Sequence, residues 1–195
     1  MTRFFAVALG LCLLGFAAVP QSSLVSAQAG PAWKTIFDGT SLNNWNPIGT
    51  ANWKLADGAV EATSGTGFLV SKESYGDFEL RAEIWVTDDA NSGIFIRASD
   101  PKQITAANSY EVNIYDKRPD PAYRTGGIVD VAKPMSMMNA GGRWNTLEIT
   151  AKGPRMTVRL NGTPMVDVEH TKYARGPIAL QYGAGTVKFR NVQIR

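Results

Sequence analysis

The feature that most restricts the fold of this chain is the alternation of apolar and polar residues at every second position. From Phe78 to Val86, apolar side chains alternate with charged residues and Trp85. This period is typical of a β-strand with one buried face. The same pattern recurs from Arg155 to Leu160, and no stretch has the 3.6-residue apolar period of a convincing helix. The sequence therefore predicts an all-β fold.

Turn sequences separate the predicted strands. Asn161-Gly162 directly follows one strand, and Asp57-Gly58 lies between two short extended segments. Both pairs tolerate positive φ, so each predicts a tight hairpin. Further strands are expected at residues 67–71, 144–151, 177–182 and 186–195. Short strands with Gly-rich turns indicate an antiparallel β-sandwich or jelly roll.

The N-terminal segment is typical of a secretory signal peptide. Arg3 precedes an apolar run at 4–19, which is shorter than the ~20 residues of a membrane-spanning helix. We predict a signal peptide at 1–27, with cleavage at 29 as the alternative, a linker at 28–32 and one domain at 33–195. A secreted or periplasmic protein is expected. Cys12 is the only cysteine, so the mature chain would have neither a disulfide nor a thiolate metal ligand.

Charge and motifs exclude several classes of function. The net charge is +3 and the charged residues are interspersed, so a nucleic-acid partner is not expected. No second apolar stretch approaches membrane length. His170 is the only histidine, and neither a P-loop nor a dinucleotide fingerprint is present. Glu111 and Asp116 have opposite parity along the predicted strand, which disfavours a two-carboxylate glycosidase.

Two predicted strands place polar side chains on one shared face. That face carries Gly93, Phe95 and Arg97 on the first strand, and Glu111, Asn113 and Tyr115 on the second. Trp85 faces outward on another strand. Aromatic rings stack on sugar rings, whose hydroxyls need amides and charged groups as partners. We therefore predict a sugar-binding face, with a solvated sheet surface as the alternative.

Several motifs, in order, resemble those of one family. They are residues 33–45 (WKTIFDGTSLNNW), 91–97 (NSGIFIR), 110–114 (YEVNI) with Asp116, 143–145 (RWN), 160–162 (LNG), 176–181 (GPIALQ) and 189–192 (FRNV). The chain is similar to the 3-keto-disaccharide hydrolase or 3-keto-glucoside lyase/hydratase family, formerly domain of unknown function 1080. The resemblance implies a concanavalin-like jelly roll, secretion in bacteria and action on oxidised sugars. Asn113 stands where the family usually has Gln, and the histidine often found after Gln181 is absent.

The implied chemistry suits a face with a single carboxylate. A ketone at C3 of a sugar acidifies the C2 hydrogen, so the C1 oxygen can leave by β-elimination without a second carboxylate. The expected roles are Glu111 as base and Arg97 as the cation for the enolate oxygen. Asn113 and Gln181 are expected to hold hydroxyls, and Trp85 or Tyr115 to stack on the sugar. A divalent metal in place of Arg97, with Glu111 as its ligand, remains open.

The segment 117–142 is long for a connection in a compact sandwich, and such loops are often functional. We expect it to fold over the rim of the polar face, with Tyr123 or Arg124 reaching the sugar and Asp130 as a further acid or metal ligand. The alternative class of function is a non-catalytic carbohydrate-binding module or surface interaction domain. It needs only the aromatic and amide contacts. The sequence indicates no oligomeric state.

Overall fold

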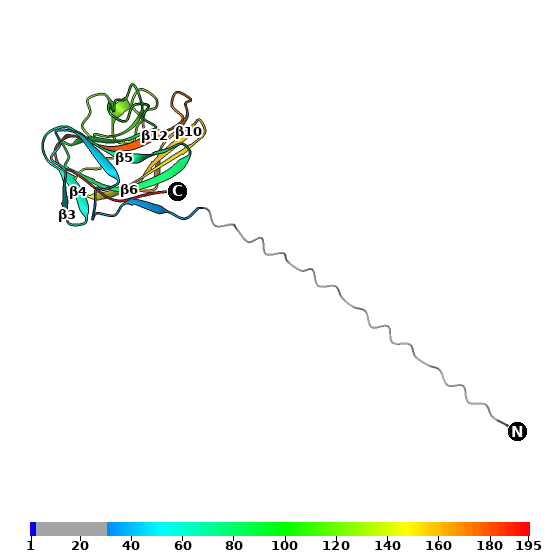
Figure 1. Cartoon of the computed structure of the whole chain (residues 1–195). Coiled ribbons are helices and arrows are strands. Elements are labelled where there is room, and N and C mark those ends of the chain that lie inside the picture. Colours follow the sequence, from blue (N-terminus) through cyan, green and yellow to red (C-terminus); the bar gives the residue numbers. More distant parts are fainter. Residues whose placement is uncertain (3–30) are drawn as a thin grey trace. The chain divides into compact units, whose positions relative to one another are not determined.

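The alternating segments form two antiparallel β-sheets that pack face to face (Figure 1). The computed structural model describes residues 1–2 and 31–195. Residues 3–30, which hold most of the predicted signal peptide, its cleavage site and the start of the predicted linker, lie outside the described residues. The predicted antiparallel β-sandwich is confirmed.

The larger sheet has eight strands. They are β1 (Lys34–Phe37), β3 (Lys54–Ala56), β4 (Ala59–Ala62), β6 (Phe78–Val86), β9 (Trp144–Lys152), β10 (Arg155–Leu160), β11 (Thr163–Glu169) and β13 (Val187–Ile194). Their order is β11-β10-β9-β6-β13-β4-β3, and β1 also pairs with β13. The strands β6, β9 and β13 are long and lie next to one another in the middle of this sheet.

The smaller sheet has five strands. They are β2 (Trp45–Gly49), β5 (Gly67–Tyr75), β7 (Asn91–Ile96), β8 (Tyr110–Ile114) and β12 (Gly176–Ala184), in the order β2-β5-β12-β7-β8. The two strands predicted to carry the polar face are therefore neighbours. A single 3-10 helix, η1 (Pro121–Tyr123), lies in the long loop, and no helix in the described part of the chain is long and apolar enough to cross a membrane.

Both predicted hairpin turns form. Asp57 and Gly58, with φ of 51° and 71°, join β3 to β4. Asn161 and Gly162, with φ of 51° and 79°, join β10 to β11. Positive φ at both central residues matches the right-handed twist of the flanking strands, which explains these residue choices.

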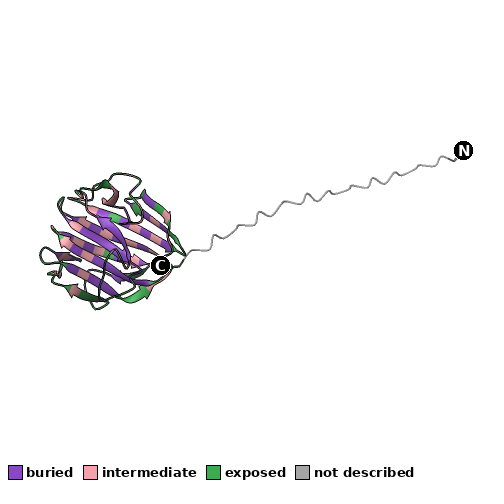
Figure 2. Cartoon of the chain, turned by 90° about the horizontal axis from the view of Figure 1, so that it is seen from above, coloured by how far each residue is buried: buried purple, intermediate pink, exposed green. Residues whose placement is uncertain are grey.

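The core lies between the sheets because each strand has one apolar face. Ile94 and Val112 of the smaller sheet and Ile84 and Phe189 of the larger sheet are fully buried in one cluster. Figure 2 shows buried and less buried residues alternating along the strands. Along β7 and β8, the residues that alternate with these buried side chains point away from the core. Gly93, Glu111 and the residues paired with them therefore form the outer face of the smaller sheet.

The long loop after β8 is fastened at both ends by one carboxylate. Asp116 accepts hydrogen bonds from the Thr125 hydroxyl (2.6 Å) and from the backbone N–H groups of Ala140 and Gly141 (2.9 and 2.8 Å). Residues 126–129 then run beside β8, where Val129 N–H donates to the Glu111 carbonyl (3.0 Å). In Figure 1, η1 lies on the side of β5 and β12 that faces away from β6. The loop therefore covers the β8 edge of the outer face.

Candidate functional site

Strand register brings three distant segments together on the outer face of the smaller sheet. Gln181 of β12 pairs with Gly93 of β7, which pairs with Asn113 of β8. In the next row, Phe95 pairs with Glu111. The carboxyl of Glu111 and the two amides thus surround Gly93, as the alternation of β7 and β8 predicts.

Gly93 leaves the space in which these groups meet. A Cβ atom at this position would lie 3.4 Å from both Gln181 Oε1 and Glu111 Cγ, and 3.2 Å from the Val112 carbonyl oxygen. Contacts of this length are tight for a methyl group, and any longer side chain would cover the polar atoms. Gly93 is itself buried, so its missing side chain lets Glu111 and the amide of Gln181 lie directly against the backbone of β7.

The carboxyl of Glu111 is almost completely buried, with 8% of the residue exposed. Burial raises the pKa of Glu111 to about 7, since desolvation disfavours the carboxylate. The positive charge of Arg118 lowers this pKa, and the negative charge of Asp130 raises it. A carboxyl with a pKa near neutrality can both accept and return a proton, which is what general base catalysis requires.

Two amide oxygens of the site have no hydrogen-bond partner in the described part of the chain. Asn113 is fully buried, and its Nδ2 donates to the carbonyl oxygen of Tyr123, which fixes the orientation of the amide. Its Oδ1 is left unpaired, as is Oε1 of Gln181. An unpaired buried acceptor costs about 1–3 kcal/mol, so this face favours a ligand that carries hydroxyl donors.

The 117–142 loop adds charged and aromatic groups beside Glu111. The guanidinium of Arg118 lies 5.3 Å from the centre of the Tyr123 ring, and a hydrogen bond to Asp130 raises the pKa of the Tyr123 phenol. Arg124 turns toward the loop itself, because its Nε donates to the Arg118 carbonyl (2.9 Å). Arg118 was not among the residues expected from the sequence, and the effect of its charge on the pKa of Glu111 makes it the cation candidate of this site.

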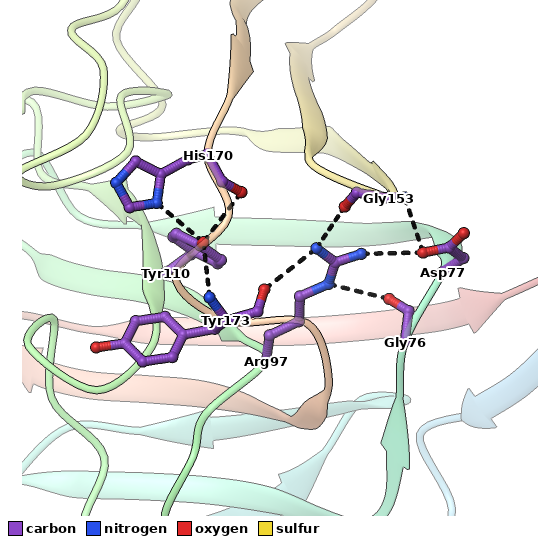
Figure 3. Close-up of polar contacts among 7 residues, drawn as sticks. All are labelled: Gly76, Asp77, Arg97, Tyr110, Gly153, His170 and Tyr173. Carbon is purple, nitrogen blue, oxygen red and sulfur yellow. Dashed lines mark hydrogen bonds and ion pairs between the residues drawn. The ribbon is translucent and has the colours of Figure 1, made fainter.

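Arg97 is not part of this site, so its predicted place beside Glu111 is wrong. Figure 3 shows the groups that bind its guanidinium instead. Its φ of 54° interrupts the alternation directly after β7. The guanidinium, 1% exposed, donates to the carbonyls of Gly76 (3.0 Å), Gly153 (2.8 Å) and Tyr173 (3.3 Å) and to Asp77 (3.2 Å). Arg97 therefore holds together three loops that connect strands at one end of the sandwich.

Trp85 is also far from the predicted place. It lies on β6 of the larger sheet, where it pairs with Trp144 of β9 and where Lys188 Nζ lies 5.4 Å from its ring centre. Its flanking residues on β6 are buried in the core, so Trp85 faces outward from the opposite sheet and cannot stack on a sugar beside Glu111. Tyr115, half-buried directly after β8, remains as the aromatic candidate at the site.

A groove of about 450 Å³ adjoins the site on the β12 side. Its lining includes Gln181 together with Ile48, Phe68, Lys102, Gln103 and Ile104. The described residues contain no group of three or more His, Cys, Asp and Glu side chains placed to hold a metal ion. The side chains that converge here instead offer one carboxyl, two amides and a cation.

The raised pKa of Glu111 predicts a pH-dependent stability. The folded state holds this proton up to about pH 7, whereas the unfolded chain releases it near the ordinary value of 4.5. The unfolding free energy should therefore lose a contribution of about 3 kcal/mol as pH rises from 4.5 to 7. Urea unfolding of the wild type and of Glu111→Gln across pH 4–8 measures this. The variant should match the wild type at pH 4 and exceed its stability at pH 8, and a constant difference would contradict the assignment.

The fold and the site define a concanavalin-like β-sandwich whose smaller sheet bears a polar, partly enclosed site. The chain belongs to the 3-keto-alpha-glucoside-1,2-lyase-like domain family, whose model matches residues 32–195. This confirms the predicted family and, with it, a carbohydrate-related function.

Solved structures share the fold at low sequence identity. A predicted glycosyl hydrolase from Parabacteroides distasonis is 24% identical with a TM-score of 0.72, over 85% of this chain and 99% of that one. The carbohydrate-binding module CBM66 from Bacillus subtilis is 18% identical with a TM-score of 0.62, over 76% and 93%. A Bacillus subtilis protein with a galectin-like fold has a TM-score of 0.60 at 10% identity, over 84% and 94%. Among curated proteins, none matches this chain.

Proposed function

We propose that the protein cleaves the glycosidic bond of 3-keto-glycosides, with Glu111 as the base. The observation that carries the proposal is the buried carboxyl of Glu111, with its pKa near 7, beside Gly93 and two unpaired amide oxygens. The unpaired oxygens of Asn113 and Gln181 supply acceptors for the hydroxyls of a sugar. Membership of a family named for 3-keto-glucoside lyases supports the choice of substrate.

The reaction balances with one base and one water molecule. Glu111 removes the proton from C2, and the electron pair moves into the C3 ketone to form an enolate. The enolate then re-forms the ketone and expels the C1 oxygen, which takes up a proton, leaving a C1–C2 double bond. Water adds at C1 and a proton returns to C2, so the net result is hydrolysis. No oxocarbenium ion and no second carboxylate are required.

The loop supplies the remaining roles in place of Arg97. The positive charge of Arg118 lowers the pKa of Glu111, so the two side chains share one environment. In this role Arg118 stabilises the enolate oxygen as a fixed cation. The phenol of Tyr123, hydrogen-bonded to Asp130, is a proton donor for the leaving oxygen. Tyr115 provides a ring against the sugar. This assignment leaves Arg124 with a role inside the loop, where its Nε is already bonded.

Replacing Arg118 with glutamine should lower kcat/KM on a 3-keto-glucoside by about 10- to 1,000-fold, because the enolate loses its cation. The same change should move the pKa of the rate profile above 7, because Arg118 holds down the pKa of Glu111. Arg118→Lys keeps the charge and should restore part of both effects. Steady-state rates from pH 5 to 9 measure them. An unchanged profile would show that Arg118 does not act on Glu111.

A non-catalytic carbohydrate-binding module is the second candidate, favoured by the likeness to CBM66 in fold. The amide acceptors alone would suffice for binding. Incubation of the protein with a 3-keto-glucoside, followed by product analysis, separates the two candidates. Release of the leaving group supports the lyase-type reaction. Return of the keto-sugar intact, together with thermal stabilisation by ordinary glycans, would support the module.

Export from the cytoplasm is also part of the proposal, on the basis of the N-terminal sequence. The charged start, the apolar run at 4–19 and the small-residue sites at 25–29 support a secreted or periplasmic location. N-terminal sequencing of the exported protein should find a chain that begins near residue 28 or 30. A chain that keeps residue 1 in the cytoplasmic fraction would contradict this.

A further inference from the structure

We infer that the groove beside Gln181 holds the leaving group of the substrate, and that it selects a ring with an apolar face. The inference rests on the proposed function, because it assigns the second half of the same substrate. Gln181 belongs to both places: it lines the groove, and its Oε1 lies against Gly93 next to Glu111.

The register of the smaller sheet sets the direction of the substrate. One continuous row crosses all five strands, from Ile48 through Phe68, Gln181 and Gly93 to Asn113. Adjacent strands are about 4.8 Å apart, so Phe68 lies roughly 10 Å from Gly93. A substrate of two rings laid across the strands would place one ring over Gly93 and the other over Phe68.

Only one direction along this row is open for the second ring. On the β8 side, the 117–142 loop lies over the face, because Asn113 is fully buried and its Nδ2 donates to the Tyr123 carbonyl oxygen. On the other side, the face continues into the groove of about 450 Å³. If C2 of the keto-sugar lies against Glu111, the group attached to C1 therefore extends over Gln181 toward β5.

The composition of the groove defines what it can hold. Its apolar side consists of Ile48, Phe68 and Ile104, and the Phe68 ring is held edge-on by Phe95 with ring centres 5.1 Å apart. Lys102 and Gln103 of the 100–108 loop form a polar rim. A fixed apolar surface with polar groups around it fits the C–H face of a sugar ring or an aromatic ring. A methyl group would leave most of this surface uncovered.

The test compares leaving groups on one reacting sugar: 3-keto-glucosides that carry methyl, glucosyl or phenyl groups at C1. Phe68→Ala should lower kcat/KM by about 10- to 100-fold for the glucosyl and phenyl substrates and by less than about threefold for methyl. Because each ratio compares variant with wild type on the same substrate, the intrinsic reactivity of the leaving group cancels. Ile104→Ala, on a loop rather than a strand, should show the same selectivity with less risk to folding.

Trp85→Ala is the matched control, since it removes a half-buried aromatic ring from the outer face of the opposite sheet. It should change all three rates equally. The groove assignment is wrong if the wild type cleaves all three substrates and each groove variant loses the same factor in kcat/KM on all of them. That result would leave the proposed function in place. Failure of the wild type to cleave any of the three would overturn the proposed function, and the leaving-group assignment with it.

Discussion

Glu111→Gln is expected to reduce kcat/KM on a 3-keto-glucoside by about 10²- to 10⁴-fold, the usual contribution of a general base. The amide has nearly the same shape as the carboxyl but cannot accept the C2 proton. Because glutamine also removes the cost of burying a charge, the variant should be at least as stable as the wild type at pH 8. Steady-state kinetics and thermal unfolding on the same preparation measure both effects.

The control for this experiment is Glu111→Asp, which keeps a base but shortens its side chain by one methylene group. It should retain more activity than the glutamine variant and less than the wild type. Full activity of a folded Glu111→Gln protein would rule out Glu111 as the base. A large loss of stability in that variant would instead show that Glu111 is needed for the fold.

Arg97→Ala is expected to lower the unfolding free energy by about 3–5 kcal/mol, because the carbonyls of Gly76, Gly153 and Tyr173 lose their buried donor. For a domain of this size, the melting temperature should fall by roughly 10 °C. Below the melting temperature, kcat/KM should stay close to the wild-type value, since Arg97 does not face Glu111. Differential scanning calorimetry and kinetics at 15 °C separate stability from activity.

Arg97→Lys tests the geometry of the same cluster. A lysine keeps the positive charge but cannot reproduce the planar fork that reaches Gly76, Gly153 and Asp77 together, so it should restore only part of the stability. The expectation for Arg97 fails if either variant keeps its melting temperature. A selective loss of turnover at full stability would return Arg97 to the catalytic site.

The strands and the Glu111 face could be predicted because both depend on short-range alternation. Glu111 and Asn113 alternate with the buried Tyr110, Val112 and Ile114, and a period of two is enough to assign them to one face. The same rule fails for Arg97, because the strand ends one residue earlier and positive φ redirects the side chain. The chain can take that path only because residue 176 is glycine, since a Cβ atom there would lie 2.2 Å from the Ala98 carbonyl oxygen. No local pattern in residues 91–97 reports this contact.

Trp85 and Arg118 show two further limits of the sequence pattern. Alternation correctly predicts that Trp85 faces outward, but the choice of sheet depends on pairing with Trp144 and Lys188, which are distant in sequence. Arg118 lies in a loop without any period, and its position depends on how Asp116 fastens that loop. The only sequence signal was the length of the 117–142 segment, which marks a functional loop but names no residue.

The most direct test of the central claim uses a 3-keto-glucoside with deuterium at C2. If Glu111 removes the C2 hydrogen in the step that leads to cleavage, the deuterated substrate should react more slowly than the ordinary one. The product should have lost its deuterium to water, in step with release of the leaving group. Equal rates for the two substrates, with the deuterium retained in the product, would mean that the C2–H bond stays intact, and would contradict the account.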